Sequence, residues 1–479
     1  MFLQLDGNGP LYLQLTRALK TALAPGGMAA GARLPPTRAL ARELGVSRNT
    51  VLAAYERLRE EGLLDGRVGS GSYVVAEPPA VADAPVAPIG IPAQSAFAQR
   101  VRQLLAPGHF IRARPPQPRY AFVYGVPSTH PALTSAWARE LSHAALYTPP
   151  TYPQPCGLPA LREAICDYLL RRRGVQAQPD DVLVVGGTQQ AMSLTARVLL
   201  DVGDEVVMEE PQYSAIRTVL QAHGAKLVPV AVDAEGIRVD ELPVFPPRLL
   251  CVAPSHQFPT GSVLSLPRRQ ALLDYANRHG CWIFEDDYDG EFRYDVKPVP
   301  ALRSLDRGNR VIYVGTFSKA LFPALRLGYM VLPLQLRDDF IAAKWLDDFG
   351  APVVEQAALA NFMHNGGFER HLRRTAKILE ERRTILLQGL RRLAGDRIEI
   401  ADSRAGMHLV VWLRGRTRAQ GEAFIAHARE RGLGLSAISQ YYLDPPDRAG
   451  LLFGFASLSA AEIGRALALF ARCLDEMPA

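Results

Sequence analysis

The sequence predicts an α/β protein of two domains, a small helical domain followed by a large one built around a mostly parallel sheet. Three observations lead to this prediction. The 479 residues exceed what a single hydrophobic core usually organises. Residues 77–95 hold five prolines and no hydrophobic period, which is typical of an extended linker. Beyond them, short apolar runs alternate with helical stretches. We expect domains at residues 1–76 and 97–479, joined by a linker over 77–96.

The bulk composition narrows the class of protein further. A net charge of +6 permits an anionic partner without requiring one. The five cysteines are scattered and form no CxxC pair, which argues against a disulfide framework or a zinc site and favours a reducing compartment. The N-terminus has no signal-peptide pattern, and no apolar run is long enough to span a membrane. We therefore expect a cytoplasmic protein with no membrane partner and no metal.

In the small domain the hydrophobic spacing predicts three helices and a hairpin. Leucines crowd a first helix after Pro10. Thr37 is expected to cap a second helix that Gly45 ends, and Ser47 to cap a third that Gly62 ends. Two short runs around a glycine-rich tip follow, which predicts a wing. The pattern is that of a winged helix-turn-helix whose third helix reads DNA.

This third helix has an inward apolar face and a polar, cationic first turn, as base and phosphate contacts require. The alternative is a solvated basic face on a protein-interaction module. However, RLPPTRALARELGVSRNTVLAAYERLREEGLLDGRVGSGSYV resembles the winged helix-turn-helix of the GntR family along nearly its whole length. The resemblance implies operator DNA as a partner, with Arg48 and Asn49 as the better candidates for reading bases. The implied contacts are Arg33, Arg38, Ser47, Arg48, Asn49, Thr50, Arg67 and Gly69.

In the large domain, apolar runs alternate with segments of helical period. The runs predict strands at residues 182–186, 205–210, 226–232, 248–254, 281–287 and 310–317. Helices are expected between some of them, at residues 190–200, 267–278 and 336–349. The tail from about residue 368 begins with a long helix and is interpreted as a smaller α+β lobe.

The segment TFSKALFPALRLGY directly follows the last of these strands. A lone lysine is usually a surface group, but Lys319 lies in an S-K-x-x-x-P-x-L-R-x-G pattern. That pattern resembles the Schiff-base segment of fold-type I aminotransferases, which carry pyridoxal 5′-phosphate (PLP). The resemblance implies that Lys319 binds PLP, with Ser318 and Arg326 beside it. A lysine in such a site is expected to have a lowered pKa, which leaves its amine free to attack an aldehyde.

The segment FEDDYDGEF places carboxylates at the carboxyl end of a strand, where doubly wound sheets bind ligands. By the same resemblance, Asp286 pairs with the pyridine nitrogen and Tyr288 lies beside the phenolic oxygen of the ring. The competing interpretation is a metal site formed by the four crowded acids, Glu285, Asp286, Asp287 and Asp289.

The run VVGGTQQAM predicts a strand, a glycine turn and a helix, which together can bind a phosphate. Tyr213 resembles the aromatic residue that stacks on the PLP ring, although it could simply be a core residue. Tyr152 resembles the tyrosine that reaches the phosphate of the neighbouring subunit, which implies a homodimer with shared sites. The groups implied at the phosphate itself are Thr188, Gln189 and Arg326.

From residue 9 to 76 and from 118 to 460, the chain resembles the MocR/GabR-type regulators of the GntR family. These proteins join a DNA-reading domain to an aminotransferase-like domain. Ordinary aminotransferases commonly have asparagine where this chain has Phe258, and His256 or Gln257 could substitute for it.

A second departure concerns the arginine that binds a substrate carboxylate near the C-terminal strand. The corresponding stretch, LLFGFA, has no arginine, and Arg404 and Arg448 are the candidates nearby.

The resemblance implies a PLP-dependent transcription regulator that senses PLP, an amine or an amino acid through an aldimine at Lys319. The two departures argue against a turnover enzyme. One alternative is a working aminotransferase that also binds DNA. Another is a DNA-binding protein with a purely dimerising remnant, which the intact set around Lys319 argues against.

Overall fold

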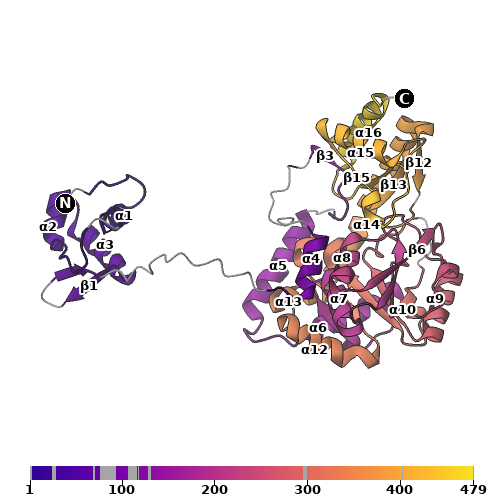
Figure 1. Ribbon diagram of the computed structural model, residues 1–479, viewed down its shortest axis with the longest axis horizontal. Coiled ribbons are helices and arrows are strands. Elements are labelled where there is room, and N and C mark those ends of the chain that lie inside the picture. Colours follow the sequence, from indigo (N-terminus) through magenta and orange to yellow (C-terminus); the bar gives the residue numbers. More distant parts are fainter. Residues whose placement is uncertain are drawn as a thin grey trace. The chain divides into compact units, whose positions relative to one another are not determined.

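The computed structural model shows two compact units, residues 1–93 and 94–479, and each is described by itself (Figure 1). Most of the predicted linker, residues 77–92, lies outside the described residues. The structure describes residues 3–23, 28–67, 71–75, 93–105, 116, 118–127, 131–294, 299–401 and 403–477. Among the helices in these ranges there is none whose length and apolar character would let it cross a bilayer.

The N-terminal unit has three helices and a hairpin, as predicted. Apolar residues of all three helices form its core, among them Leu15, Leu40 and Tyr55. The N-cap of the second helix is Pro36 and not the predicted Thr37, because Pro36 holds an extended backbone and the helix starts directly after it. The elements are α1 (Leu11–Leu23), α2 (Thr37–Leu44), α3 (Arg48–Glu60), β1 (Leu64–Arg67) and β2 (Gly71–Val74).

The large unit is built around an eight-stranded sheet with the order β4-β11-β10-β9-β8-β5-β6-β7. All six predicted runs are strands of this sheet, and the pairs from β10 through β6 are parallel. The strand β11 was not predicted, and it runs antiparallel to both of its neighbours. The strands are β4 (Val182–Val185), β5 (Glu205–Glu210), β6 (Lys226–Asp233), β7 (Gly236–Ile237), β8 (Leu249–Val252), β9 (Trp282–Asp287), β10 (Val311–Thr316) and β11 (Gly328–Val331).

Helices cover both faces of this sheet, and strands such as β8, β9 and β10 are buried on both sides. The neighbouring residues Leu183 and Val184 of β4 belong to two different hydrophobic cores, as expected for a strand covered on both faces. The helices of the large lobe are α4 (Ala96–Leu104), α5 (Pro131–Tyr147), α6 (Pro159–Arg173), α7 (Thr188–Leu199), α8 (Ser214–His223), α9 (Leu266–His279), α10 (Leu302–Leu305), α11 (Phe317–Ala320), α12 (Arg337–Asp348) and α13 (Val353–His364).

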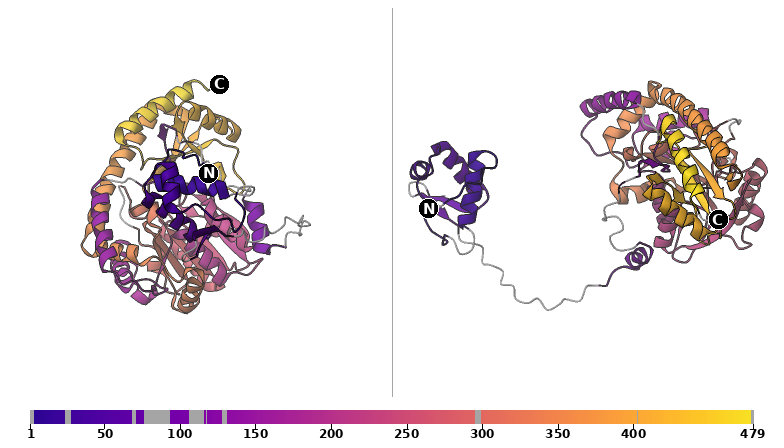
Figure 2. Two further views of the ribbon diagram at one scale, coloured as in Figure 1. Left: turned by 90° about the vertical axis from the view of Figure 1, so that its left-hand side faces the viewer. Right: turned by 90° about the horizontal axis from the view of Figure 1, so that it is seen from above.

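The C-terminal residues form a smaller lobe, as predicted, and Figure 2 shows it in yellow and orange from two further sides. Its antiparallel sheet has the order β12-β13-β16-β15. The short strand β3 (Tyr120–Ala121) pairs with β14 (Leu433–Gly434), which ties the segment before α5 to this lobe. The lobe contains β12 (Ile398–Ala401), β13 (His408–Leu413), β15 (Ser436–Ala437), β16 (Gly450–Gly454), α14 (Gly367–Ala394), α15 (Arg418–Glu430) and α16 (Ala460–Asp475). The predicted α/β fold class is confirmed.

Candidate functional site

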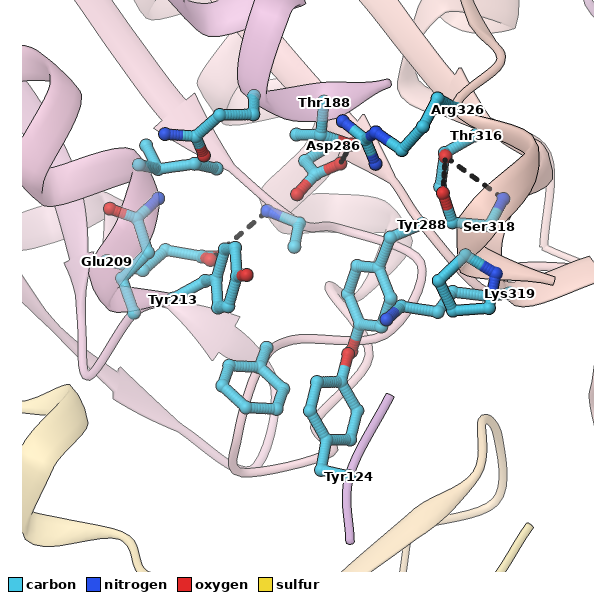
Figure 3. A pocket seen from close by; sticks show the side chains of 16 residues that line it. Tyr124, Thr188, Glu209, Tyr213, Asp286, Tyr288, Thr316, Ser318, Lys319 and Arg326 are labelled. Carbon is cyan, nitrogen blue, oxygen red and sulfur yellow. Dashed lines mark hydrogen bonds between the residues drawn. The ribbon is translucent and has the colours of Figure 1, made fainter. Parts of the chain in front are cut away.

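A pocket of about 260 Å³ lies where several parallel strands of the large sheet end, the position at which doubly wound folds bind ligands (Figure 3). Residues at or just beyond the carboxyl ends of β4, β5, β8, β9 and β10 contribute to its wall. The lining residues are Tyr124, Thr188, Gln189, Glu209, Gln212, Tyr213, Ile216, Ala253, Phe258, Asp286, Tyr288, Thr316, Ser318, Lys319, Pro323 and Arg326.

Lys319 enters the pocket from α11, the short helix that follows β10. The hydroxyl of Thr316 accepts a hydrogen bond from the amide of Ser318 at 3.2 Å and so begins this helix. The Nζ atom of Lys319 donates to the carbonyl of Gly125 at 3.1 Å. A Cβ at Gly125 would come within 2.7 Å of that Nζ, so a larger residue there would displace the amine from this position. Burial lowers the pKa of Lys319, which favours the neutral, nucleophilic amine.

The four crowded acids of the FEDDYDGEF segment do not form one cluster. Because successive residues of β9 point to opposite faces, Asp286 lines the pocket while Glu285 and Asp287 face away. Glu285 accepts hydrogen bonds from two backbone amides at the start of α10, and Asp287 pairs with an arginine of α6. Asp289 contacts His256. Among the described residues, no group compact enough for a metal combines these four acids.

Asp286 is buried, and it accepts a hydrogen bond from the hydroxyl of Thr188 at 3.3 Å. Burial, and next the charge of Asp287, raise the pKa of Asp286 to about 7. Burial also raises the pKa of Glu209, a second acid in the pocket wall, to about 8. A cation placed beside Asp286 would reverse this penalty and stabilise the carboxylate.

These raised pKa values predict how the stability of the cofactor-free protein depends on pH. A carboxyl with a higher pKa folded than unfolded stabilises the fold fully at low pH and loses that contribution as the pH rises through the folded value. The melting temperature should therefore fall from pH 5 to pH 8, and Asp286→Asn should make this fall shallower. Thermal melts across this range test the prediction, with the exposed Asp396→Asn as control. Parallel wild-type and Asp286→Asn curves would contradict it.

A cradle for an anion lies at the N-terminus of α7. Gly187 is the N-cap residue with φ 104°, and the first amides of the helix, which include those of Thr188 and Gln189, follow it. A Cβ at Gly187 would lie 3.6 Å from two guanidinium nitrogens of Arg326 and 3.7 Å from the hydroxyl of Thr316. Helix amides, a guanidinium and a hydroxyl therefore meet around a space that glycine keeps open. This donor set suits a phosphate dianion.

The predicted aromatic and histidine residues occupy different places. Tyr213 is half-exposed, and it lines the pocket on the side across from Tyr288 (Figure 3). His256 does not line the pocket, since it lies behind Tyr288 with its Nδ1 atom 3.0 Å from the tyrosine hydroxyl. Tyr152 also lies outside the pocket, with 88% of its surface exposed.

Neither arginine considered for a carboxylate reaches the pocket. Arg404 is exposed and does not line it. Arg448 pairs with Glu399 and lies over the ring of Trp412, 4.4 Å from its centroid. Of the described residues that line the pocket, the two with cationic groups are Lys319 and Arg326.

Four lining residues with polar side chains, namely Glu209, Thr316, Gln212 and Tyr124, were not predicted from the sequence. Glu209 and Thr316 lie at the ends of strands that were predicted, so strand-end position alone could have indicated them. Gln212 is next to Tyr213 in the same turn. Tyr124 follows a two-residue strand and had no signal in the sequence.

On the N-terminal unit, Arg38, Arg48 and Asn49 are exposed, the last two in the first turn of α3. Ser47 caps α3, since its hydroxyl accepts a hydrogen bond from the amide of Thr50 at 3.1 Å, and the two hydroxyls are 2.8 Å apart. These two residues therefore position the turn that carries Arg48 and Asn49.

Arg33 is exposed beside the wing, where a Cβ at Gly71 would lie 2.9 Å from its Nε atom. Arg59 was not predicted, and it donates to the hydroxyl of Ser72 at 2.8 Å, which joins α3 to the wing. Arg67 belongs to β1, and the predicted contact Gly69 lies outside the described residues.

Comparisons with known proteins agree with this geometry. Residues 11–74 match the family described as bacterial regulatory proteins, gntR family, and residues 123–470 match aminotransferase class I and II. The probable rhizopine catabolism regulatory protein MocR of Rhizobium meliloti is 39% identical over 96% of this chain and 92% of its own length. The pyridoxine biosynthesis transcriptional regulator PdxR of Corynebacterium glutamicum is 31% identical over 93% of this chain and 91% of its own.

Among solved structures, LysN, the alpha-aminoadipate aminotransferase of Thermus thermophilus, superposes with a TM-score of 0.69 at 25% identity. The match covers 80% of this chain and 96% of LysN, which places the large unit in the PLP-dependent aminotransferase fold. The relatives match both units in one chain, so the predicted family is confirmed. The chain belongs to the MocR-type transcription regulators of the gntR family, which join a helix-turn-helix domain to an aminotransferase class I and II domain.

Proposed function

We propose that PLP binds at Lys319 and that the large unit responds to PLP, an amine or an amino acid by changing how the N-terminal unit binds operator DNA. The observation that carries this proposal is the convergence of Lys319, Asp286 and the Gly187 cradle on one pocket. LysN, the relative of known structure, was crystallised with N-(5′-phosphopyridoxyl)-L-leucine. A pocket of the same fold therefore accommodates PLP joined to an amino acid.

The residues present fit PLP group by group. The cradle at Gly187 and Arg326 would hold the phosphate, and the carboxylate of Asp286 would pair with the protonated pyridine nitrogen. Tyr213 would stack on the ring. When bound, PLP supplies an aldehyde that amines attack and a ring that withdraws electrons. Lys319, whose pKa is lowered by burial, supplies the first of those amines.

The residues that line the pocket favour sensing over repeated turnover. Its lining cations, Lys319 and Arg326, are both assigned to PLP, so none of the described lining residues is left to bind the carboxylate of an amino acid. Phe258 lines the pocket where an asparagine commonly tunes the ring oxygen. An effector amine can therefore react with the PLP aldehyde, but the pocket provides few groups that would orient it for repeated amino transfer.

We also propose a homodimer that acts in the cytoplasm, where operator DNA is found. Tyr152 lies outside the pocket of its own subunit and beside exposed apolar residues, with its ring 6.0 Å from that of Phe349. An exposed apolar patch of this kind supports an interface with a second copy. The proposed division remains a DNA-binding domain at 1–76, a linker at 77–96 and a PLP-binding domain at 97–479.

Substitution of Arg48 tests the DNA-reading helix. Its side chain is exposed in the first turn of α3, where a recognition helix contacts bases. We expect Arg48→Ala to weaken operator binding by about 1–3 kcal/mol, the range of one base contact, and to leave PLP loading unchanged. Fluorescence anisotropy with labelled operator measures the first quantity and absorbance the second.

The matched control is Arg57→Ala, which removes a guanidinium from the C-terminal end of the same helix. Equal operator affinity for wild type and Arg48→Ala would show that this turn does not read the bases.

Arg67→Ala in the wing should instead weaken binding to all DNA sequences and make the affinity depend less steeply on salt concentration, as loss of a phosphate contact does.

A further inference from the structure

A group of buried polar side chains lies directly behind Tyr288, outside the pocket wall. The Nδ1 atom of His256 is 3.0 Å from the hydroxyl of Tyr288 and 2.9 Å from a carboxylate oxygen of Asp289. The Nε2 atom of the same ring is 2.8 Å from the hydroxyl of Ser403, which comes from the small lobe. His256, Asp289 and Ser403 are each at most 2% exposed.

The hydrogen-bond pattern fixes which nitrogen of His256 carries a proton. The Ser403 hydroxyl donates its proton to the carbonyl of Ala405 at 2.8 Å, so towards His256 it can only accept. The Nε2 atom must therefore be the donor. In a neutral imidazole this leaves one lone pair on Nδ1. Two groups can donate a proton to that lone pair, the hydroxyl of Tyr288 and the protonated carboxyl of Asp289.

Besides the proton on Nε2, a second proton lies between the carboxyl of Asp289 and the Nδ1 atom of His256. Burial raises the pKa of Asp289 well above its ordinary value and lowers the pKa of His256 to about 3, which favours a pair that is neutral overall, with the carboxyl as donor to Nδ1. The other charged groups that act on these residues are Asp287, Arg173, Arg293 and Lys319. The ring of His408 is also adjacent, 4.9 Å from that of His256 between centroids.

We propose that Asp289 and His256 are positioning residues that direct the hydrogen bond of the Tyr288 hydroxyl. They prevent it from donating to His256, so that it donates to a group in the pocket. Because the shared proton occupies the line between Asp289 and Nδ1, the proton of Tyr288 is excluded from that lone pair. The same holds if the proton sits on Nδ1, since Tyr288 can then only accept from it. Tyr288 therefore presents a donor to any ligand oxygen beside it, which under the proposed function is the phenolic oxygen of PLP.

This arrangement accounts for the phenylalanine at position 258. Phe258 lines the pocket but has no donor. Gln257 does not replace one, because its amide nitrogen donates to the carbonyls of Pro211 and Phe258 at 2.6 and 2.8 Å. His256 is the substitute for the missing amide, and it acts through Tyr288 rather than by contact with the ligand.

The pH at which the visible band of the PLP-loaded protein changes tests this proposal. A hydrogen bond from Tyr288 stabilises an anionic ligand oxygen and so lowers its pKa. In Asp289→Leu, the Nδ1 atom can accept the hydrogen bond of Tyr288, which the ligand oxygen then loses. The midpoint pH of the change in the visible band should therefore rise by roughly 1–2 pH units, as expected for one charge-assisted bond. Asp289→Asn should keep the wild-type midpoint, because its amide still donates to Nδ1. Tyr288→Phe should match Asp289→Leu, and the double variant should shift no further.

The matched control is Glu291→Gln, a nearby acid whose partner, Tyr168, lies outside the pocket wall. Shifts that add in the double variant, or equal shifts for Asp289→Leu and Asp289→Asn, would overturn the proposal. A wild type with no visible band would contradict the proposed function instead.

A measurement on the cofactor-free wild type remains decisive even if Asp289→Leu does not fold. In ¹⁵N-histidine NMR spectra, His256 should have a protonated Nε2 atom. A proton on Nδ1 with a bare Nε2 would overturn the proposal. So would one equivalent of zinc in the purified protein, lost in His256→Phe, because a metal would occupy Nδ1 instead.

Discussion

Lys319→Ala should abolish covalent binding of PLP. The wild type should be yellow, and borohydride should fix the cofactor to a peptide that contains Lys319. The physical reason lies in the surroundings of Lys319. Its side chain lines the pocket, burial lowers its pKa, and no other lysine is among the described residues that line the pocket. After borohydride treatment the variant should hold no covalently attached cofactor, while the cradle at Gly187 still binds PLP weakly through its phosphate.

Two observations keep this experiment interpretable. Lys377→Ala, which removes an exposed lysine of α14, should behave as wild type. Peptide mapping of the borohydride-treated protein then identifies the attachment site directly. Attachment at any other lysine would contradict the assignment of Lys319.

The strands of the large sheet could be predicted because each is a short apolar run bounded by polar residues. A strand buried on both faces needs such a run, and Val182–Val185 and Val311–Thr316 show it clearly. The strand Gly328–Val331 was not predicted, because its first two residues belong to the segment that was interpreted as the lysine motif. Its antiparallel direction follows from tertiary packing, which no local pattern encodes.

The residues of the site divide in the same way. Asp286 and Lys319 stand in local patterns at strand ends, where a sequence shows them together with their context. The positions of His256 and Tyr124 depend on contacts between segments far apart in the chain. Sequence reasoning left His256 and Gln257 as equal substitutes for an asparagine, and only their partners in the fold distinguish them. The prediction that Arg404 or Arg448 binds a carboxylate was wrong for the same reason. Both residues are near the motif in the sequence, but neither lines the pocket.

The coupling between the two units is the property that distinguishes a sensor from an enzyme. A chain segment of about 19 residues can reach at most roughly 60 Å, which exceeds the roughly 34 Å between half-sites one DNA turn apart. Two readers on one dimer could therefore adopt more than one spacing. An effector changes operator affinity only if it binds those arrangements unequally.

We expect PLP, or PLP with one suitable amine, to change operator affinity by roughly 5–150-fold, which corresponds to coupling energies of about 1–3 kcal/mol. The response should disappear in Lys319→Ala, because an amine can then no longer exchange with the lysine at the cofactor. Anisotropy titrations of operator DNA across an amine panel measure the shift, and Lys377→Ala should retain it. The same panel should give little sustained amino transfer, because the described lining cations are both assigned to PLP. Rapid multiple-turnover transfer with unchanged operator affinity would refute the sensor and make the chain an enzyme that also binds DNA.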